Sequence, residues 1–274
     1  MKTKLRDKLI EKANDHADRG EHHEAIALLE SLGGKGPNWV GLNLGNSYSA
    51  VGDVAAAQKA FEQSWIAGCD DAGFNLAELY RDVGKVSRAR TIYRRLIQKS
   101  YVKAMVQEAE ELREEGDVPA AQALLARALK DEGPTGDYAA GLLGYLLWSS
   151  THSVTAEPLL RRGQHAYPTA RTCLAKVVMK LGRLSEAIAI LEEGVSQGEQ
   201  ESMLPLGNIW RDLGNEDAAE SLYRQSYAVG DAHSAGNLGL LRWDQGRMKS
   251  ARKWLKRAVK AGDKKAQAWL DELK

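Results

Sequence analysis

Glycine returns through this sequence at a fixed interval. The glycines form two evenly spaced series whose members are 32 positions apart, Gly20, Gly52, Gly84 and Gly116, and then Gly182, Gly214 and Gly246. The wider gap between Gly116 and Gly182 leaves room for one further unit. An alanine follows each glycine by five residues, and the same phase places the extra unit at Ala156, with Thr151 in the glycine position. Such a period is the sequence signature of a repeat protein.

Two other positions keep the same phase. A large apolar residue lies nine residues after each turn, at Leu29, Phe61, Tyr93, Leu125, Leu160, Leu191, Tyr223 and Leu255. A small residue lies seven residues before each turn, at Ala13, Gly45, Ala77, Ala109, Gly144, Ala175, Gly207 and Gly239. The residue before the small one is leucine in six units, and Lys12 and Glu108 are the exceptions.

These positions predict pairs of helices. Each unit has two segments of about 13 residues with apolar positions three or four apart, which is typical of amphipathic helices. The glycine lies where a helix end needs a left-handed residue. The small residue and the alanine let two backbones approach closely. One hairpin cannot bury its apolar face alone, so neighbouring hairpins are expected to stack. No segment alternates with period two, and no sheet is expected.

The pattern resembles the tetratricopeptide repeat (TPR). Gly45, Tyr48, Gly52, Ala57, Phe61 and Ser64 carry most of its positions, and the series Ala77, Tyr80, Gly84, Ala89 and Tyr93 repeats it. Pro37 and Pro168 lie where a proline ends the second helix of that repeat. The resemblance covers about residues 5 to 263. The period is 32 instead of about 34 residues, and junctions such as KAGDKKAQAW are closer to the Sel1-like branch, although the longer hairpin loop of that branch is missing.

The resemblance implies an all-α protein, an α-solenoid of about eight units in a right-handed superhelix with a C-terminal capping helix. We expect one repeat domain over 1–274. Its units are predicted at 5–36, 37–68, 69–100, 101–133, 134–167, 168–198, 199–230 and 231–262, and its cap at 263–274.

Composition excludes several classes of function. Lys and Arg number 38 against 37 Asp and Glu, and a formal net charge of +1 argues against a general nucleic-acid binder. Two cysteines, Cys69 and Cys173, fit a reduced cytosolic chain without a disulfide framework. The charged first residues lack a signal-peptide core, and no apolar run reaches the roughly 18 residues of a membrane span. A cytoplasmic location away from membranes is therefore expected.

Motifs for catalysis and cofactors are absent from the sequence. No phosphate-binding loop, Gly-x-Ser-x-Gly or His-Glu-x-x-His occurs. His16, His22 and His23 lie across a predicted hairpin turn without completing a ligand set. We therefore expect no enzyme activity, no metal and no cofactor.

In the TPR family the first helices line a concave groove that holds a peptide. The resemblance places groove residues two before, and one, four and five after, the small position. The predicted peptide-binding residues, two further lysines included, are Asn43, Asn46, Asn75, Arg81, Lys103, Arg113, Tyr145, Trp148, Lys176, Asn208, Arg211, Asn237, Trp243 and Lys265. An asparagine amide both donates and accepts, so it can hold peptide backbone. The alternative is that these amides bond within their own repeat.

Some TPR co-chaperones hold a C-terminal carboxylate in a clamp of Lys, Asn and Arg. Asn46, Asn75 and Lys103 fill three of the five clamp positions, and Asn208, Asn237 and Lys265 fill the same three later in the chain. The first lysine is replaced by Leu42 and Leu204, and the arginine by Gln107 and Trp269. One exposed cation holds a carboxylate weakly, at about 0–1 kcal/mol.

The other groove positions also allow two interpretations. Arg81, Arg113 and Arg211 are each followed by an acid, which is typical of a solvated, self-neutralised face. Tyr145, Trp148 and Trp243 are either anchors for a partner or packing against the next repeat. The nine Lys and Arg within 247–265 form either a polar end cap or a basic face for an acidic partner.

The sequence thus predicts a non-enzymatic scaffold that binds a segment of another protein in its groove. The alternatives are a structural protein that assembles with itself and a regulatory protein that senses a peptide. A monomer or a weak homo-oligomer is expected, with no nucleic-acid or membrane partner.

Overall fold

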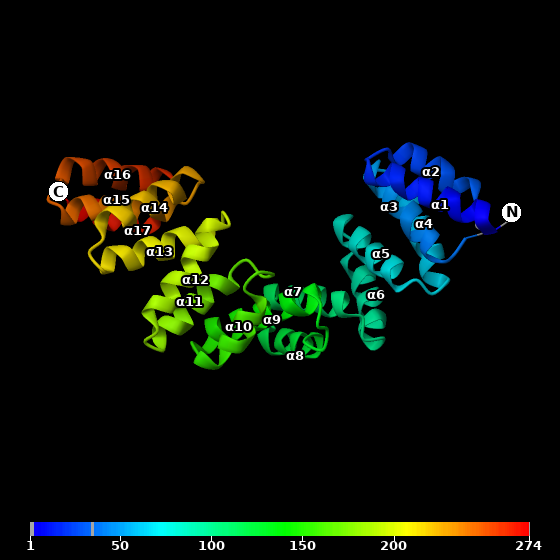
Figure 1. Ribbon diagram of the computed structural model, residues 1–274, viewed down its shortest axis with the longest axis horizontal. Coiled ribbons are helices and arrows are strands. Elements are labelled where there is room, and N and C mark those ends of the chain that lie inside the picture. Colours follow the sequence, from blue (N-terminus) through cyan, green and yellow to red (C-terminus); the bar gives the residue numbers. More distant parts are fainter. Residues whose placement is uncertain (1–2, 34–35, 274) are drawn as a thin grey trace. The chain divides into compact units, whose positions relative to one another are not determined.

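The computed structural model describes residues 3–33 and 36–273, and the described residues form helices and no strand (Figure 1). The helices are α1 (Thr3–Asp18), α2 (His22–Ser31), α3 (Trp39–Ala50), α4 (Val54–Ile66), α5 (Asp70–Asp82), α6 (Val86–Gln98), α7 (Val102–Glu114), α8 (Val118–Ala128), α9 (Pro134–Thr151), the short 3-10 helix η1 (Val154–Ala156), α10 (Glu157–Gly163), α11 (Ala170–Lys180), α12 (Leu184–Ser196), α13 (Gln200–Asp212), α14 (Glu216–Ala228), α15 (Ala232–Asp244), α16 (Met248–Lys260) and α17 (Lys264–Glu272). Residues 34–35 and 274 of the predicted first unit and cap lie outside the described residues.

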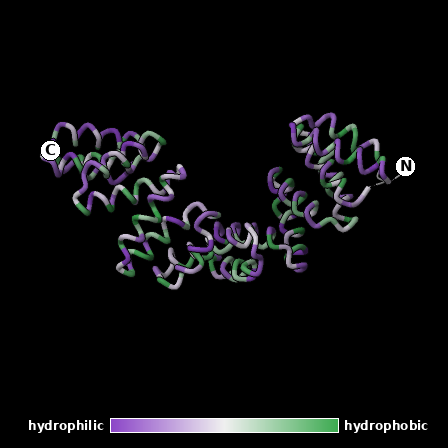
Figure 2. Tube along the Cα trace, viewed as in Figure 1, coloured by the Kyte–Doolittle hydropathy of each residue, from purple (hydrophilic) through white to green (hydrophobic). Residues whose placement is uncertain are grey.

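The helices pair in chain order into hairpins. The chain divides into two compact units, residues 1–128 with α1 to α8 and residues 129–274 with α9 to α17. Within each unit an odd-numbered helix packs on the even-numbered helix after it, and each hairpin contacts the next. Hydrophilic and hydrophobic residues are mixed along the helices (Figure 2), as is expected of amphipathic helices. The predicted all-helical solenoid fold is confirmed.

The turn glycines take the predicted left-handed conformation. Their φ angles lie between +71° and +87°. A second series, at Gly68, Gly198, Gly230 and Gly262, ends the second helices with φ between +82° and +104°. Gly68, Gly198 and Gly230 each lie midway between two turn glycines, and Gly262 follows Gly246 by the same 16 residues, so the repeat is divided into equal halves. Ser100 takes the equivalent position after α6 with a φ of +65°.

The prediction for Thr151 is wrong. Thr151 is the last residue of α9, and the left-handed residue of that turn is His152, with a φ of +51°. The 3-10 turn η1 follows, so this hairpin is joined differently from the others. The alanine phase still holds there, because Ala156 is fully buried.

Small residues allow the two helices of each hairpin to touch. The eight phased alanines are all fully buried, as close packing requires, at Ala25, Ala57, Ala89, Ala121, Ala156, Ala187, Ala219 and Ala251. A Cβ added to Gly45 would lie 2.4 Å from Cδ1 of Phe61, and one on Gly207 would lie 2.7 Å from Cε1 of Tyr223. The small residue of the first helix therefore makes room for the large residue of the second.

The first helices of neighbouring hairpins lie closer together than the second helices. In the first unit α1 contacts α3 and α3 contacts α5, and in the second unit α9 contacts α11 and α11 contacts α13. Consecutive second helices in the described residues share no comparable contact. We call the surface of the odd-numbered helices the inner face of each unit. The second helices spread apart on the opposite side.

Candidate functional site

Pairs of asparagines connect the first helices across the inner face. Nδ2 of Asn75 donates to Oδ1 of Asn46 at 2.7 Å, and the same bond joins Asn43 to Asn14 at 2.8 Å. In the second unit Asn237 donates to Asn208 at 2.7 Å. The partner belongs to the preceding hairpin in each of these amide pairs. The interpretation that each amide bonds within its own repeat is therefore wrong for these donors.

The amide pairs keep hydrogen-bonding capacity for another molecule. Each pair uses one N–H and one oxygen lone pair, whereas a primary amide offers two donors and two acceptor sites. Asn46 is exposed and Asn75 is half-buried. Oδ1 of Asn208 also accepts from the hydroxyl of Tyr223 at 2.8 Å, which fixes its orientation. The pairs thus hold neighbouring hairpins together and still present polar atoms at the surface.

A polar hollow of about 390 Å³ lies beside the first amide pair. Asn14, Asn43 and Asn46 line it together with His22. Nδ1 of His22 is buried and has no hydrogen-bond partner among the described residues. The hollow brings two of the predicted groove residues together at the surface of α1 and α3.

The amide pattern is interrupted in the second unit at two junctions, first at Tyr145 and Cys173 and then at Lys176 and Pro205. Lys176 and Pro205 have the same separation in sequence as an amide pair, and a hollow of about 510 Å³ opens between them. Pro205 lies inside α13 and has no N–H, so the carbonyl of Glu201 lacks its usual helical donor. Leu204 adds an apolar wall. Lys176 is among the predicted groove residues and Pro205 is not, although a proline within a helical pattern is a visible signal.

The clamp positions come together only in part. Asn46 and Asn75 bond to each other, and Nζ of Lys103 faces Oδ1 of Asp71 at 3.8 Å. Lys265 is exposed on α17, where Asp263 caps its backbone N–H. The predicted lysine of the first unit thus already has an acidic neighbour.

The predicted arginines form local ion pairs. Arg113 pairs with Glu114 at 3.4 Å and Arg211 with Asp212 at 3.0 Å, as the sequence suggested. Arg81 instead pairs with Glu78, one helical turn away, at 2.6 Å. Pairs this exposed contribute about 0–1 kcal/mol.

Two of the predicted aromatic anchors pack against neighbouring residues. The ring of Tyr145 lies 5.8 Å from that of Tyr167, and Trp148 lies 5.2 Å from the His152 ring. Nζ of Lys180, on the next first helix, lies 5.7 Å above Trp148. Trp243 is half-buried on α15. Tyr167 and His152 belong to the same predicted unit as the two aromatics, so contact with the next repeat is seen for Trp148, through Lys180.

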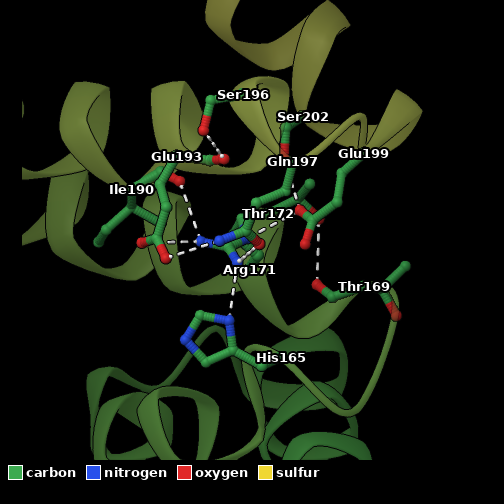
Figure 3. A network of polar contacts seen from close by, with 10 residues as sticks. All are labelled: His165, Thr169, Arg171, Thr172, Ile190, Glu193, Ser196, Gln197, Glu199 and Ser202. Carbon is green, nitrogen blue, oxygen red and sulfur yellow. Dashed lines mark hydrogen bonds and ion pairs between the residues drawn. The ribbon is translucent and has the colours of Figure 1, made fainter.

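A buried arginine forms the centre of a polar network that the repeat pattern does not predict (Figure 3). Arg171 is fully buried on α11, where it pairs with Glu199 at 2.7 Å and Glu193 at 3.1 Å. Its guanidinium also bonds Gln197 and His165 at 3.0 Å each. The network joins α11 to α12 and to the start of α13. A lone arginine in an amphipathic pattern is typical of a surface residue, so no signal marks it.

Neither clustered metal ligands nor a membrane-spanning helix occurs in the described part of the chain. No group of three potential metal-binding side chains lies within residues 3–33 and 36–273. Among those residues no helix is long and apolar enough to cross a bilayer.

Comparison with known proteins agrees with this geometry. Residues 42–103 and 204–266 match the family model of the tetratricopeptide repeat. These two segments are similar to TPR units. Both matched segments include an amide pair and its flanking hairpins. No curated protein sequence matches the chain.

Solved structures show the same TPR and Sel1-like fold. The protective antigen c5321 of uropathogenic Escherichia coli, which displays an SLR fold, is 18% identical with a TM-score of 0.76 over 90% of this chain and 58% of its own. A Sel1 repeat protein from Oxalobacter formigenes is 18% identical with a TM-score of 0.51, and the match covers 92% of this chain and 99% of that protein. Pseudomonas aeruginosa pilF is 17% identical with a TM-score of 0.59, and the match covers 70% of this chain and 91% of pilF. This chain thus spans little more than half of the antigen. TPR and Sel1-like proteins are generally scaffolds for protein interactions and typically not enzymes.

Proposed function

We propose that this TPR-like protein is a non-enzymatic scaffold that holds a segment of a partner protein on the inner face of its helix pairs. The observation that supports this most is the amide pair of the exposed Asn46 and the half-buried Asn75, and a half-buried pair of the same kind joins Asn208 and Asn237. An amide donates and accepts at once, and so does each peptide unit of a bound segment. Such contacts hold a backbone with little dependence on its sequence.

Selectivity for side chains would come from the interruption at Lys176 and Pro205. The hollow there is lined by Lys176, by the acidic residues Glu201 and Asp231, and by the apolar Leu204. A segment lying along the inner face would place one side chain in this hollow. The remaining predicted groove residues, including Lys103, Trp243 and Lys265, would contact its flanks.

Site-specific photocrosslinking tests the proposal in cells that make the protein. A benzoylphenylalanine is placed at Lys103 or Lys176 on the inner face, and at Lys253 or Lys256 on the second helix α16 as matched controls, all four being exposed lysines. We expect adducts with a partner protein from the inner-face positions only. Equal adducts from the controls would contradict the proposal, and adducts between two copies of the chain would favour self-assembly.

A further inference from the structure

An apolar hollow of about 640 Å³ lies between the second helices α4 and α6, away from the inner face. Leu76 and Tyr80 of α5 form its floor, and Trp65, Ile66 and Ile92 form its walls. Ile66 is 85% exposed, more than any other exposed large apolar residue of the described chain. An apolar residue left this open beside an apolar hollow is typical of an interaction site.

The rim of the hollow is positively charged. The guanidinium of Arg95 lies 5.6 Å from the Trp65 ring centre, and that of Arg88 lies 5.7 Å from the Tyr80 ring centre. Glu62 is the one acid in the lining, and it accepts hydrogen bonds from Tyr80 at 2.8 Å and Gln58 at 2.9 Å. Helix α6 itself contains four arginines and no acid. The lining of the hollow therefore carries two arginines against one carboxylate.

Charged residues take two of the equivalent positions elsewhere in the chain, although leucine takes the position of Leu76 in five other units. The position of Leu76 is taken in the next repeat by Glu108, which is 8% exposed and lies in the field of Arg90 and Arg94. The position of Tyr80 is taken in the last hairpin by Arg242, which bonds Glu220 and, at 2.7 Å, Gln245. At these two places a charged side chain takes the position, whereas the floor of the α4–α6 hollow is apolar and aromatic.

We propose that this hollow docks an acidic amphipathic helix of a partner protein. One large apolar side chain of that helix enters between α4 and α6 onto Leu76 and Tyr80, and carboxylates on either side of it face Arg88 and Arg95. Recognition of an amphipathic helix by an apolar groove is a general mode of binding, and complementary charge at the rim selects the partner. The site is separate from the inner face and does not depend on the function proposed above.

Methyl NMR of the full-length protein locates the binding. The probe is a 15-residue helical peptide with leucines along one face and flanking glutamates, and the matched control carries lysines in place of the glutamates. We expect the δ1-methyl signals of Ile66 and Ile92 to shift with the glutamate peptide, while those of Ile10 and Ile209 stay in place. The lysine peptide should bind at least tenfold more weakly.

Surface variants distinguish specific binding in this hollow from non-specific binding of the peptide to the protein surface. The substitution Ile66→Ser, or Arg88→Gln together with Arg95→Gln, should weaken the glutamate peptide at least tenfold with the helical circular dichroism unchanged. Leu213→Ser, at a leucine that is 51% exposed in the second unit, should leave binding unchanged. The proposal fails if neither methyl moves at millimolar peptide, or if the lysine peptide binds equally well. It also fails if the Ile66 signal shifts with protein concentration alone, since a second copy would then be the occupant.

Discussion

Asn75 donates a hydrogen bond to Asn46 at 2.7 Å, and this bond ties the first helix of one hairpin to the first helix of the hairpin before it. The bond lies on the inner face, where Asn46 is exposed and Asn75 half-buried. It therefore contributes to stacking and is also available to a partner. The two contributions can be measured separately.

Replacing Asn75 by alanine should lower the free energy of unfolding by about 0.5–1.5 kcal/mol, the usual net contribution of one hydrogen bond. Asn237→Ala should cost a similar amount, and the two losses should add, because the residues lie in different compact units. Urea unfolding followed by circular dichroism measures both. A loss above about 3 kcal/mol, twice the usual contribution or more, would show that the amide pairs are mainly structural.

Ser100→Gly should stabilise the protein by about 1 kcal/mol. Ser100 ends α6 with a φ of +65°, a conformation that costs a non-glycine residue about 1–2 kcal/mol, and the equivalent helix ends carry glycine. Part of the gain is offset by the greater freedom of glycine in the unfolded chain. The melting temperature should rise. As a control, Gly84→Ala should lower the melting temperature, because φ is +76° at that position. An added Cβ would meet nothing within 4 Å, so the loss would report the backbone conformation alone.

Arg171→Ala should destabilise the second unit by about 1.5–3 kcal/mol, the usual contribution of hydrogen bonds to a charged group. The substitution removes the bonds to Gln197 and His165 and empties a fully buried site. The two carboxylate partners of Arg171 remain partly exposed to water. Urea unfolding monitored in both units should show the loss in residues 129–274. Lys59→Ala, on an exposed lysine, serves as the control and should change little. Loss of less than about 1 kcal/mol for Arg171→Ala would contradict the account of this network.

Glu108→Leu should stabilise the protein at pH 7 by about 1–2 kcal/mol, because it restores the buried leucine found at this position in six other units. Burial raises the pKa of Glu108, and the charges of Arg90 and Arg94 oppose that effect. A raised pKa means that the folded protein binds the proton more readily than the unfolded chain. The cost of burying the charged carboxylate is thus present at neutral pH and disappears as the pH falls through that pKa.

The gain from Glu108→Leu should therefore shrink between pH 7.5 and pH 4.5. Parallel urea titrations of the wild type and the variant at both pH values measure it. Glu114→Leu, at a glutamate whose side chain is 71% exposed, is the matched control and should give no comparable gain. An equal gain at both pH values would show that the ionised carboxylate carries no penalty.

Sequence periodicity is sufficient to predict the helices and their packing. The turn glycines and phased alanines depend only on local backbone conformation and on contact within one hairpin. Residues such as Gly45, Ala57 and Phe61 are therefore enough to predict how the two helices of a hairpin pack. The repeat phase marks Thr151 where the left-handed residue is His152, because α9 continues through Thr151 where other first helices have ended. Without a glycine, the sequence holds no marker for the left-handed residue.

The candidate site is harder to predict, because it depends on contacts between hairpins. Asn46 and Asn75 are predicted as groove residues, yet their bond to each other requires the spacing between first helices, which the repeat period does not give. The same holds for the hollow between Lys176 and Pro205. The buried position of Arg171 has no sequence signal for a different reason, since its acidic partners come from two later segments.

The affinity of a peptide for the inner face tests the account most directly. A peptide is selected from a random 12-residue phage library on the wild-type protein, and its binding is measured by calorimetry. The account predicts that Asn46→Ala combined with Asn75→Ala, or Asn208→Ala combined with Asn237→Ala, weakens binding at least tenfold. Asn38→Ala, which removes a bond of Asn38 to the Ala67 carbonyl, should leave binding unchanged. Unchanged affinity in both double variants, with only a loss of stability, would contradict the proposed function.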